Sequence, residues 1–480
     1  MSRFTWTSGA VREALGLSTQ HRGDRDGRGR RDGRDNGDAG AVYSGVSTDS
    51  RSIAEGDLYV ALRGENFDGH DFVAEALAAG AAGAVVSRPV DVQSQEQLYS
   101  VEDTLIALGA LAAYRRQALD VPVVAITGSS GKTSTKDLAR AAIAGAARVH
   151  ATSGNFNNRI GMPLTLLATP SEVEVVILEL GSNEPGEIAT LAAIAQPDIG
   201  VVTTVGESHL EKLGSLEGVL EEKLDLLRAV AGRGTCLVGA DPATLVEGAR
   251  AICPSVRVAG WGERADSELR PQQVEVDAFG AHRFHWHGQS VSLALPGRHS
   301  VANAMIALAI AEMVGIDPKD AVQGIASAEP GSLRGEVRRI GGLTVVVDCY
   351  NANPQSVRAA LDLLQGQSTA SRTVAVLGTM LELGEAAERL HEETLSYALG
   401  LDIDLIVATG AFAGTAAATS GTDRVLCADD WQSAYPSVRE RLDGDEVVLL
   451  KASRGVALEG ILPSLERDFG AQTQSPAVEA

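Results

Sequence analysis

The sequence predicts an α/β protein with three domains and a doubly wound parallel sheet in the central one. Two observations carry this prediction. The runs VEVVILEL (173–180) and IGVVTTV (199–205) are continuous and rich in β-branched residues, which is typical of strands buried on both faces of a parallel sheet. Helical patterns lie between such runs along much of the chain, and this alternation favours open sheets covered by helices on both faces.

The remaining elements follow in chain order. DLYVAL (57–62) predicts a strand, residues 71–86 a helix running into another strand, and residues 102–119 a helix that precedes a strand starting at Val121. A third alternating region begins near Arg334. Its expected strands are LTVVVDC (343–349), TVAVLG (373–378), DLIVATG (404–410) and EVVLLKAS (446–453).

These patterns place domain boundaries near residues 119 and 331. We expect a smaller N-terminal α/β domain (1–119), a central domain with the phosphate loop described below (120–330) and a Rossmann-like C-terminal domain (331–480). Residues 21–38, HRGDRDGRGRRDGRDNGD, have almost no apolar side chains and are predicted to be a disordered insertion, because they cannot bury enough surface to offset their ordering entropy. The arginines of this segment could suggest RNA binding, but the negative charge of its aspartates nearly cancels their positive charge.

Composition excludes some classes of function. The net charge is −22, which argues against nucleic acid as a main partner. Four scattered cysteines without a CxxC pair indicate reduced thiols and a cytoplasmic protein. The N-terminus has no apolar signal core, and no run of about 20 apolar residues predicts a membrane span.

The stretch ITGSSGKTS (126–134) predicts a phosphate-binding loop between a strand and a helix. Gly128 and Gly131 permit the tight turn, and the amides from Ser129 to Thr133 can point at phosphate oxygens. Lys132 can reach the β- and γ-phosphates, and Thr133 can place its hydroxyl on Mg²⁺. The spacing G-x-x-G-K-T is a shortened relative of the common motif, and the loop alone does not say which reaction uses the phosphate.

Three charged or titratable residues follow the loop, each with an ordinary alternative. Glu179 ends an apolar strand and is well placed for a metal ion, or is a solvated strand end. His209 follows another strand end and could equally be a surface or hydrogen-bonded residue. Lys223 lies in the helical pattern LEEKLDLL and, taken alone, predicts a charge on a solvated face.

Two further stretches are weaker signals. ATSGNFNNRIGMPLT (151–165) is dense in Asn, Ser and Thr, which offer donors and acceptors to a polar ligand or cap a turn. HRFHWH (282–287) places His285 and His287 on one expected strand face, as metal ligands could be. Without further suitable ligands nearby, an ordinary strand is the favoured interpretation.

Taken together, the motifs resemble one family, the Mur ligases of bacterial peptidoglycan synthesis. The resemblance is carried by TGSSGKT, LELG, GESHLE and PGRHSVANAMIALAIA in the family's order, and by STDSR, GENFDGHDF, TSGNFNNRIGMPLT, NEPGEI, DCYNANPQS and LGTMLELGE. It spans nearly the whole chain after the insertion. Two departures are the insertion itself and Ser300, where the family usually has asparagine.

The resemblance implies a three-domain ATP- and Mg²⁺-dependent amide ligase. Its substrates would be a UDP-N-acetylmuramoyl-tripeptide and D-alanyl-D-alanine, its intermediate an acyl phosphate, and its expected state a cytoplasmic monomer. The alternatives are a sister ligase of the Mur or folylpolyglutamate type, which adds a single amino acid, and a P-loop NTPase switch that does no amide chemistry. The third residue of the tripeptide, diaminopimelate or lysine, is left open.

The same resemblance assigns roles to residues. The expected catalytic residues are Lys132, Glu179, His209, Lys223 and Arg454. The expected ATP-binding residues are Gly128, Ser129, Ser130, Gly131, Lys132, Thr133, Ser134, His299, Asn303, Arg334, Asp348 and Asn351. The expected substrate-binding residues are Ser47, Asp49, Ser50, Arg51, Thr152, Ser153, Asn155, Asn158, Lys451 and Ser453. Magnesium is expected at Thr133, Glu179, His209 and Lys223, with Lys223 carbamylated by carbon dioxide.

Overall fold

The computed structural model describes residues 4–17, 41–277, 280–329, 331–367, 372–416 and 423–470. The predicted disordered insertion lies outside these residues. The chain forms two units, the first made of residues 1–125, 148–181 and 189–198 and the second of residues 126–147, 182–188 and 199–480. The predicted domain boundaries near residues 119 and 331 stay predictions.

The first unit contains a four-stranded parallel sheet with the order β3-β4-β5-β6. Tyr59, Val73, Ala76 and Val86 form part of the core beneath it. The elements of this unit are β1 (Trp6–Thr7), α1 (Ser8–Ala14), β2 (Val42–Tyr43), β3 (Val46–Ser47), β4 (Leu58–Val60), α2 (Val73–Ala78), β5 (Gly83–Val86), β6 (Leu98–Ser100), α3 (Thr104–Gln117), β8 (Val149–Ala151), α5 (Gly161–Leu167) and β9 (Val175–Glu179).

The central strands form a six-stranded sheet with the order β12-β11-β10-β7-β9-β8. Every residue of β9 and of β10 (Ile199–Val202) is buried, which confirms the prediction of strands covered on both faces. The division between the units runs through β7 (Val123–Thr127) and through α6 (Glu187–Ala195). Parallel pairing joins β10 to β11 and β11 to β12.

The second unit continues with helices and a three-stranded antiparallel sheet of order β13-β14-β15. Helix α10 packs against α4 and α11. The elements are α4 (Lys132–Ala144), α7 (Leu210–Leu213), α8 (Leu216–Val230), β11 (Thr235–Gly239), α9 (Ala243–Ile252), β12 (Arg257–Ala259), β13 (Gln272–Val276), β14 (His282–Trp286), β15 (Gln289–Leu293), α10 (Arg298–Met313) and α11 (Pro318–Ala326).

The prediction that His285 and His287 share a strand face is wrong. Strand β14 ends at Trp286, which pairs with Gln289, so His287 and Gly288 form the turn. His287 has a φ of 47°, a left-handed backbone that the two-residue hairpin turn requires. The two histidines therefore do not form a metal-binding pair on one strand face.

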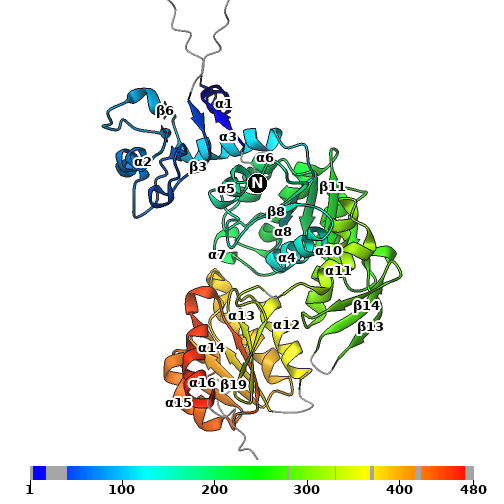
Figure 1. The fold of residues 1–480 in the computed structure, drawn as a ribbon. Helices are drawn as coiled ribbons and strands as arrows, with labels where there is room; N and C mark the ends of the chain where they lie inside the picture. Colours follow the sequence, from blue (N-terminus) through cyan, green and yellow to red (C-terminus); the bar gives the residue numbers. More distant parts are fainter. Residues whose placement is uncertain are drawn as a thin grey trace, which may run out of the picture. The chain divides into compact units, whose positions relative to one another are not determined.

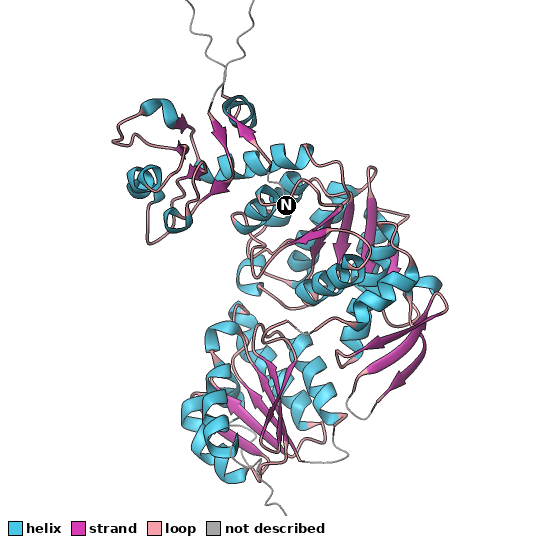
Figure 2. Cartoon of the chain, viewed as in Figure 1, coloured by secondary structure: helices cyan, strands magenta, loops and turns pink. Residues whose placement is uncertain are grey.

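The second unit ends in a six-stranded sheet of order β16-β17-β21-β18-β19-β20, in which only β16 is antiparallel. Helices cover both of its faces (Figures 1 and 2). The predicted strands of this region are all present. The elements are β16 (Glu336–Ile340), β17 (Leu343–Asp348), α12 (Pro354–Gln365), β18 (Thr373–Leu377), α13 (Ala387–Leu399), β19 (Leu405–Thr409), α14 (Ala411–Ala416), β20 (Val425–Ala428), α15 (Trp431–Arg441), β21 (Val447–Lys451) and α16 (Leu462–Phe469).

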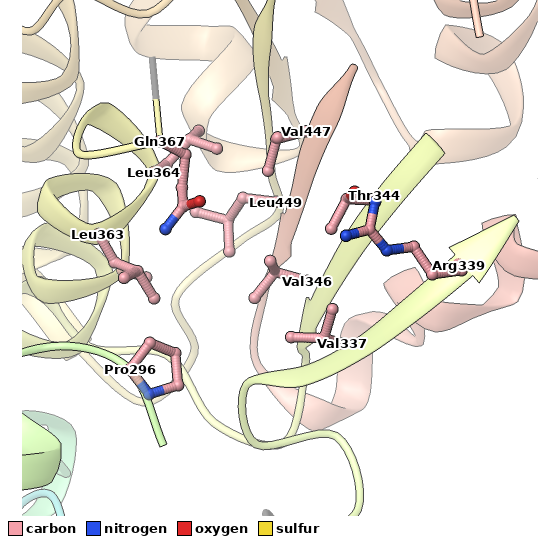
Figure 3. Close-up of a pocket in the computed structure, with 11 residues that line it drawn as sticks. Pro296, Val337, Arg339, Thr344, Val346, Leu363, Leu364, Gln367, Val447 and Leu449 are labelled. Atoms are coloured by element: carbon pink, nitrogen blue, oxygen red, sulfur yellow. Dashed lines mark hydrogen bonds between the residues drawn. The ribbon is translucent and has the colours of Figure 1, made fainter. Parts of the chain in front are cut away.

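The two faces of this sheet are packed differently. Val345 and Val347 belong to a core cluster that includes Tyr435 of α15 and Leu465 of α16. The opposite face borders a cavity of about 290 Å³ beside α12, where Val346 and Leu449 face helix residues that include Leu363 (Figure 3). Among the helices of the described residues, none combines the length and apolar character that a bilayer crossing demands.

Replacing Ala360 by leucine is expected to stabilise the protein. Ala360 lines the cavity from α12, so a larger apolar side chain would fill empty space and gain contacts. Cavity filling commonly adds about 0.5–2 kcal/mol to the free energy of unfolding, which urea denaturation would measure. Ala359→Leu on the same helix is the control, because Ala359 does not line the cavity. An equal gain in both variants would contradict cavity filling.

Stability is expected to fall as the pH drops from about 7 toward 5. His391 and His282 are buried, and burial lowers the pKa of both imidazoles below the ordinary value of 6.5. The unfolded chain therefore binds protons that the folded chain does not, so their contribution is fully present above pH 6.5 and is lost below it. Each excluded proton costs about 1.4 kcal/mol per pH unit in that window.

His391 gives this pH dependence a specific test. Its Nε2 accepts a hydrogen bond from the Met380 N–H at 2.9 Å, and its Nδ1 lies 2.7 Å from the Ala387 carbonyl. A neutral imidazole satisfies both contacts. Urea unfolding at pH 7.5 and 5.5 should show a weaker pH dependence in His391→Gln than in the wild type, and an unchanged dependence would contradict this assignment.

Candidate active site

The phosphate loop follows β7 and leads into α4. Gly128 and Gly131 have φ values of 145° and 80°, and neither position has room for a side chain. A Cβ on Gly128 would lie 2.1 Å from Thr203 Oγ1, and one on Gly131 would lie 2.5 Å from Asn303 Oδ1. Glycine is therefore required at both positions of the predicted motif.

The segment after β10 supports the base of this loop. Thr203 Oγ1 donates to the Ser130 carbonyl at 2.6 Å. Ser129 Oγ donates to the Gly206 carbonyl at 2.9 Å and accepts a hydrogen bond from Ser208 Oγ at 2.9 Å. These bonds fix the loop before any ligand binds.

One expectation about the loop is wrong in this structure. The Ser129 N–H donates to the Thr204 carbonyl at 2.9 Å, so it does not point at a phosphate. Ser129 is only 2% exposed and supports the turn from within. The sequence pattern could not distinguish it from its neighbours, because its partner comes from another strand end.

Two lysines lie near this loop. Lys132 Nζ donates to the Gly128 carbonyl at 2.6 Å. Lys223 is 1% exposed and donates to Ser182 Oγ at 2.6 Å. Burial, and then the neighbouring charge of Lys132, lowers the pKa of Lys223 to about 7. The alternative of a solvated charge is therefore wrong for Lys223.

Glu222, next to Lys223 on α8, is also buried. Its carboxylate accepts hydrogen bonds from the Gly186 N–H at 2.7 Å and from the Ile188 N–H at 2.8 Å. It therefore holds the start of α6 and is engaged there, whereas Glu221 is exposed and pairs with Arg228. Sequence analysis missed this role of Glu222.

His209 precedes the short helix α7 and has a φ of 53°. Its Nδ1 lies 2.6 Å from Glu382 Oε2, and this close contact holds the pKa of the Glu382 carboxyl below its usual value. The Glu211 N–H donates to the Glu382 carbonyl at 3.2 Å. His209 thus lies against the Glu382 carboxylate here, and its expected role at a metal ion stays a prediction.

A second cavity, of about 50 Å³, lies beside α4 and α10. It brings together four of the predicted ATP-binding residues, Ser134, His299, Asn303 and Arg334. Arg334 also stacks over Tyr350, with its guanidinium carbon 3.7 Å from the ring centroid. Asp137 and Glu329 line the same cavity and could accept hydrogen bonds from an amino group of a bound base. Sequence analysis did not single out these two carboxylates.

Lys451 at the end of β21 contacts the expected residues after β17, whereas Ser453 and Arg454 have other partners. Lys451 is 1% exposed, and its Nζ lies 3.0 Å from Asp348 Oδ2 and donates to the Asn351 carbonyl. Ser453 Oγ accepts a hydrogen bond from the Leu381 N–H at 3.0 Å. Arg454 pairs with Glu459. These contacts place the cations within the C-terminal sheet region, and their substrate roles stay predictions.

In the first unit, the polar loop after β8 surrounds Glu179. Glu179 is 2% exposed, so a solvated strand end is excluded. Thr152 Oγ1 accepts a hydrogen bond from the Glu179 N–H at 2.9 Å, and Asn157 Nδ2 donates to Glu179 Oε1 at 2.8 Å. Asn157 was missed, although it lies in the same asparagine-rich run. Asn158 caps the turn into α5 through bonds from the Ile160 and Gly161 N–H groups.

The expected uridine-binding residues lie near the end of β3. Asp49 Oδ1 accepts a hydrogen bond from the Arg51 N–H, and the two side chains form an ion pair at 2.7 Å. This bonding from Arg51 lowers the pKa of Asp49 to about 2. Ser47 Oγ accepts a hydrogen bond from the Asp49 N–H at 3.2 Å. Ser50 begins the turn that Asp49 caps, while Ser153 and Asn155 are exposed on their loop.

Comparisons with known proteins agree with this arrangement. Family models match as Mur ligase family, catalytic domain over residues 42–141, Mur ligase middle domain over residues 126–311, and Mur ligase, glutamate ligase domain over residues 333–454. The UDP-N-acetylmuramoyl-tripeptide–D-alanyl-D-alanine ligase of Bacillus subtilis (strain 168) is 37% identical over 88% of this chain and 93% of its own length.

Two solved ligase structures are similar in fold to this chain over most of its length. A crystal structure of MurF from Acinetobacter baumannii superimposes with a TM-score of 0.85 at 29% identity, covering 97% of this chain and 100% of that one. MurF ligase from Thermotoga maritima in complex with ADP gives a TM-score of 0.78 at 28% identity, covering 88% of this chain and 97% of that one.

Proposed function

This chain belongs to the Mur ligase family, and from that membership we propose that it joins D-alanyl-D-alanine to a UDP-N-acetylmuramoyl-tripeptide with the hydrolysis of ATP. The product is the pentapeptide precursor of peptidoglycan. The observation that carries this proposal is that the similar curated proteins from Bacillus subtilis, Synechocystis and Escherichia coli, 32–37% identical over 88–90% of this chain, all bear the name of that ligase.

The reaction needs ATP because a carboxylate has a poor leaving group. An oxygen of the tripeptide carboxylate attacks the γ-phosphorus of ATP, ADP leaves, and an acyl phosphate forms. The amine of D-alanyl-D-alanine then attacks the acyl carbon, phosphate leaves and the nitrogen loses a proton. Because the first step brings two anions together, positive charge has to lie beside the transferred phosphoryl group.

The residues of this chain supply part of that charge. Lys132 starts α4 at the end of the phosphate loop, where the helix N-terminus adds favourable partial charge. We assign its ammonium to the β- and γ-phosphates, and the cavity with Ser134, His299, Asn303 and Arg334 to the nucleoside end of ATP. Arg454 and Lys451 are assigned to the acyl phosphate or the incoming dipeptide.

The donors expected at magnesium fit a hard cation. Thr133 offers a hydroxyl and Glu179 a carboxylate, and magnesium prefers such oxygen ligands. When bound, the ion would neutralise charge on the phosphates. His209 and Lys223 complete the proposed set.

The coupling of ATP use to substrates tests this function. Phosphate release by the full-length protein should require both the tripeptide nucleotide and D-alanyl-D-alanine, and should be measured with the diaminopimelate and the lysine tripeptide. Release that needs neither substrate would indicate an NTPase switch. Release supported by a single amino acid in place of the dipeptide would indicate a sister ligase.

We also propose that the enzyme acts in the cytoplasm as a monomer. All four cysteines are free thiols, three of them buried, which agrees with a reducing compartment. Sedimentation of the purified protein would measure the oligomeric state, and a dimer at assay concentration would contradict the second part.

A further inference from the structure

The segment that starts α12 contacts the phosphate loop directly, although 223 residues separate Ser130 from Asn353. Asn353 Nδ2 donates to Ser130 Oγ at 3.1 Å, and Asn353 is only 2% exposed. Two residues on, Gln355 Nε2 donates to Thr204 Oγ1 at 3.1 Å. The C-terminal sheet region therefore reaches the loop and the segment that supports it.

These contacts are close packed. A Cβ on Gly206 would lie 2.8 Å from Gln355 Oε1, so the end of the Gln355 side chain lies against the backbone of residue 206. Thr204 in turn accepts the Ser129 N–H through its carbonyl. The side chain of Gln355 thus supports the same loop that Asn353 holds at Ser130.

We propose that Asn353 is a positioning residue for the phosphate loop: by holding Ser130, it keeps the turn before Lys132 in the conformation that receives the phosphates of ATP. This inference rests on the proposed function only for the reaction that follows ATP binding. It predicts that the phosphate loop loses affinity for ATP when the Asn353–Ser130 hydrogen bond is removed, because the loop is then less well preorganised.

The chemistry of asparagine suits this position. Its Oδ1 accepts the Ser356 N–H at 2.8 Å and caps α12, while its Nδ2 donates in the other direction to Ser130. Aspartate caps a helix as well as asparagine does, but it has no N–H to donate, so it keeps only the longer contact in which Ser130 Oγ donates to Oδ1 at 3.5 Å. The substitution Asn353→Asp therefore keeps the cap and removes the shorter of the two hydrogen bonds with the loop.

A double-mutant cycle tests the proposal. The wild type, Asn353→Asp, Ser130→Ala and the double variant would be titrated calorimetrically with a non-hydrolysable ATP analogue, using the full-length protein. Each single variant should bind about ten-fold more weakly, which is the effect of one well-placed hydrogen bond. The double variant should bind no more than about ten-fold more weakly, because both changes remove the same bond.

Asp430→Asn is the matched control. Asp430 forms the same kind of capping box at the start of α15, so the exchange of the same two residue types there should leave ATP affinity unchanged. A double variant weakened about hundred-fold, as independent sites would be, overturns the proposal. A lower melting temperature of Asn353→Asp with unchanged ATP affinity also overturns it, since Asn353 would then serve only the helix cap.

The two proposals fail separately. A wild-type protein that binds the analogue but releases no phosphate with both substrates would defeat the proposed function, while the cycle would still measure the Asn353–Ser130 coupling.

Discussion

Replacing Lys132 by alanine is expected to lower the ligation rate by about 10²–10³-fold or more, the usual effect of removing a group that stabilises charge in the transition state. The lysine is the first residue of α4, directly after Gly131, and its ammonium lies 2.6 Å from the Gly128 carbonyl. In the reaction this ammonium would turn from a neutral carbonyl to the phosphates. Phosphate release with both substrates present measures the effect.

The fold of Lys132→Ala should survive, because the side chain is only partly buried and alanine is a good helix former. Thermal melting within a few degrees of the wild type would confirm this. Lys319→Ala removes an exposed lysine on α11 and should leave the rate unchanged. Near-normal turnover of Lys132→Ala would contradict the assignment of the phosphate loop.

The parts of the fold that the sequence predicts best are those set by local patterns. Continuous β-branched runs predict the strands β9 and β10, because a strand covered on both faces needs apolar residues at every position. The phosphate loop is equally predictable, since the positive φ values of Gly128 and Gly131 belong to one short segment. Both features require no knowledge of distant residues.

Contacts across the chain could not be predicted in the same way. The hydrogen bond from Asn353 to Ser130 and the close contact of His209 with Glu382 join residues far apart in sequence, and no periodicity specifies the partner of a single polar side chain. The same applies to Ser129, whose N–H donates a hydrogen bond to the Thr204 carbonyl. The structure is needed to see which loop amides are engaged.

The burial of Lys223 could be predicted in part, because the sequence around it contains a helical pattern of apolar residues. On α8, Val219, Lys223, Leu227 and Val230 recur at helical spacing, and all four are buried. This spacing places the lysine on the apolar face of the helix. The adjacent acidic residues favoured a solvated face instead, and only Glu221 of the two lies on one.

This burial gives the carbamate hypothesis a physical basis. Carbamate formation requires a neutral amine that attacks carbon dioxide, forms a C–N bond and releases one proton. Lys223 has its pKa lowered to about 7, first by burial and then by the charge of Lys132, so a large share of the amine is neutral at pH 7–8. Among the described residues, its only hydrogen bond is to Ser182 Oγ, a neutral group.

Lys223→Ala is therefore expected to be nearly inactive, with partial recovery when a short carboxylic acid is supplied in solution to replace the carbamate oxygens. Phosphate release measures both effects.

Because the reacting amine must be neutral, carbamylation of the wild type should increase as the pH rises through 7. ¹³C NMR of the protein with labelled carbon dioxide would detect the carbamate without any turnover. Glu221→Ala, an exposed neighbour on the same helix, should keep its activity. Full activity of Lys223→Ala without added acid would defeat the hypothesis, as would the absence of a labelled carbamate signal at pH 8, since a buried amine with this pKa would then remain unmodified where the reaction is most favourable.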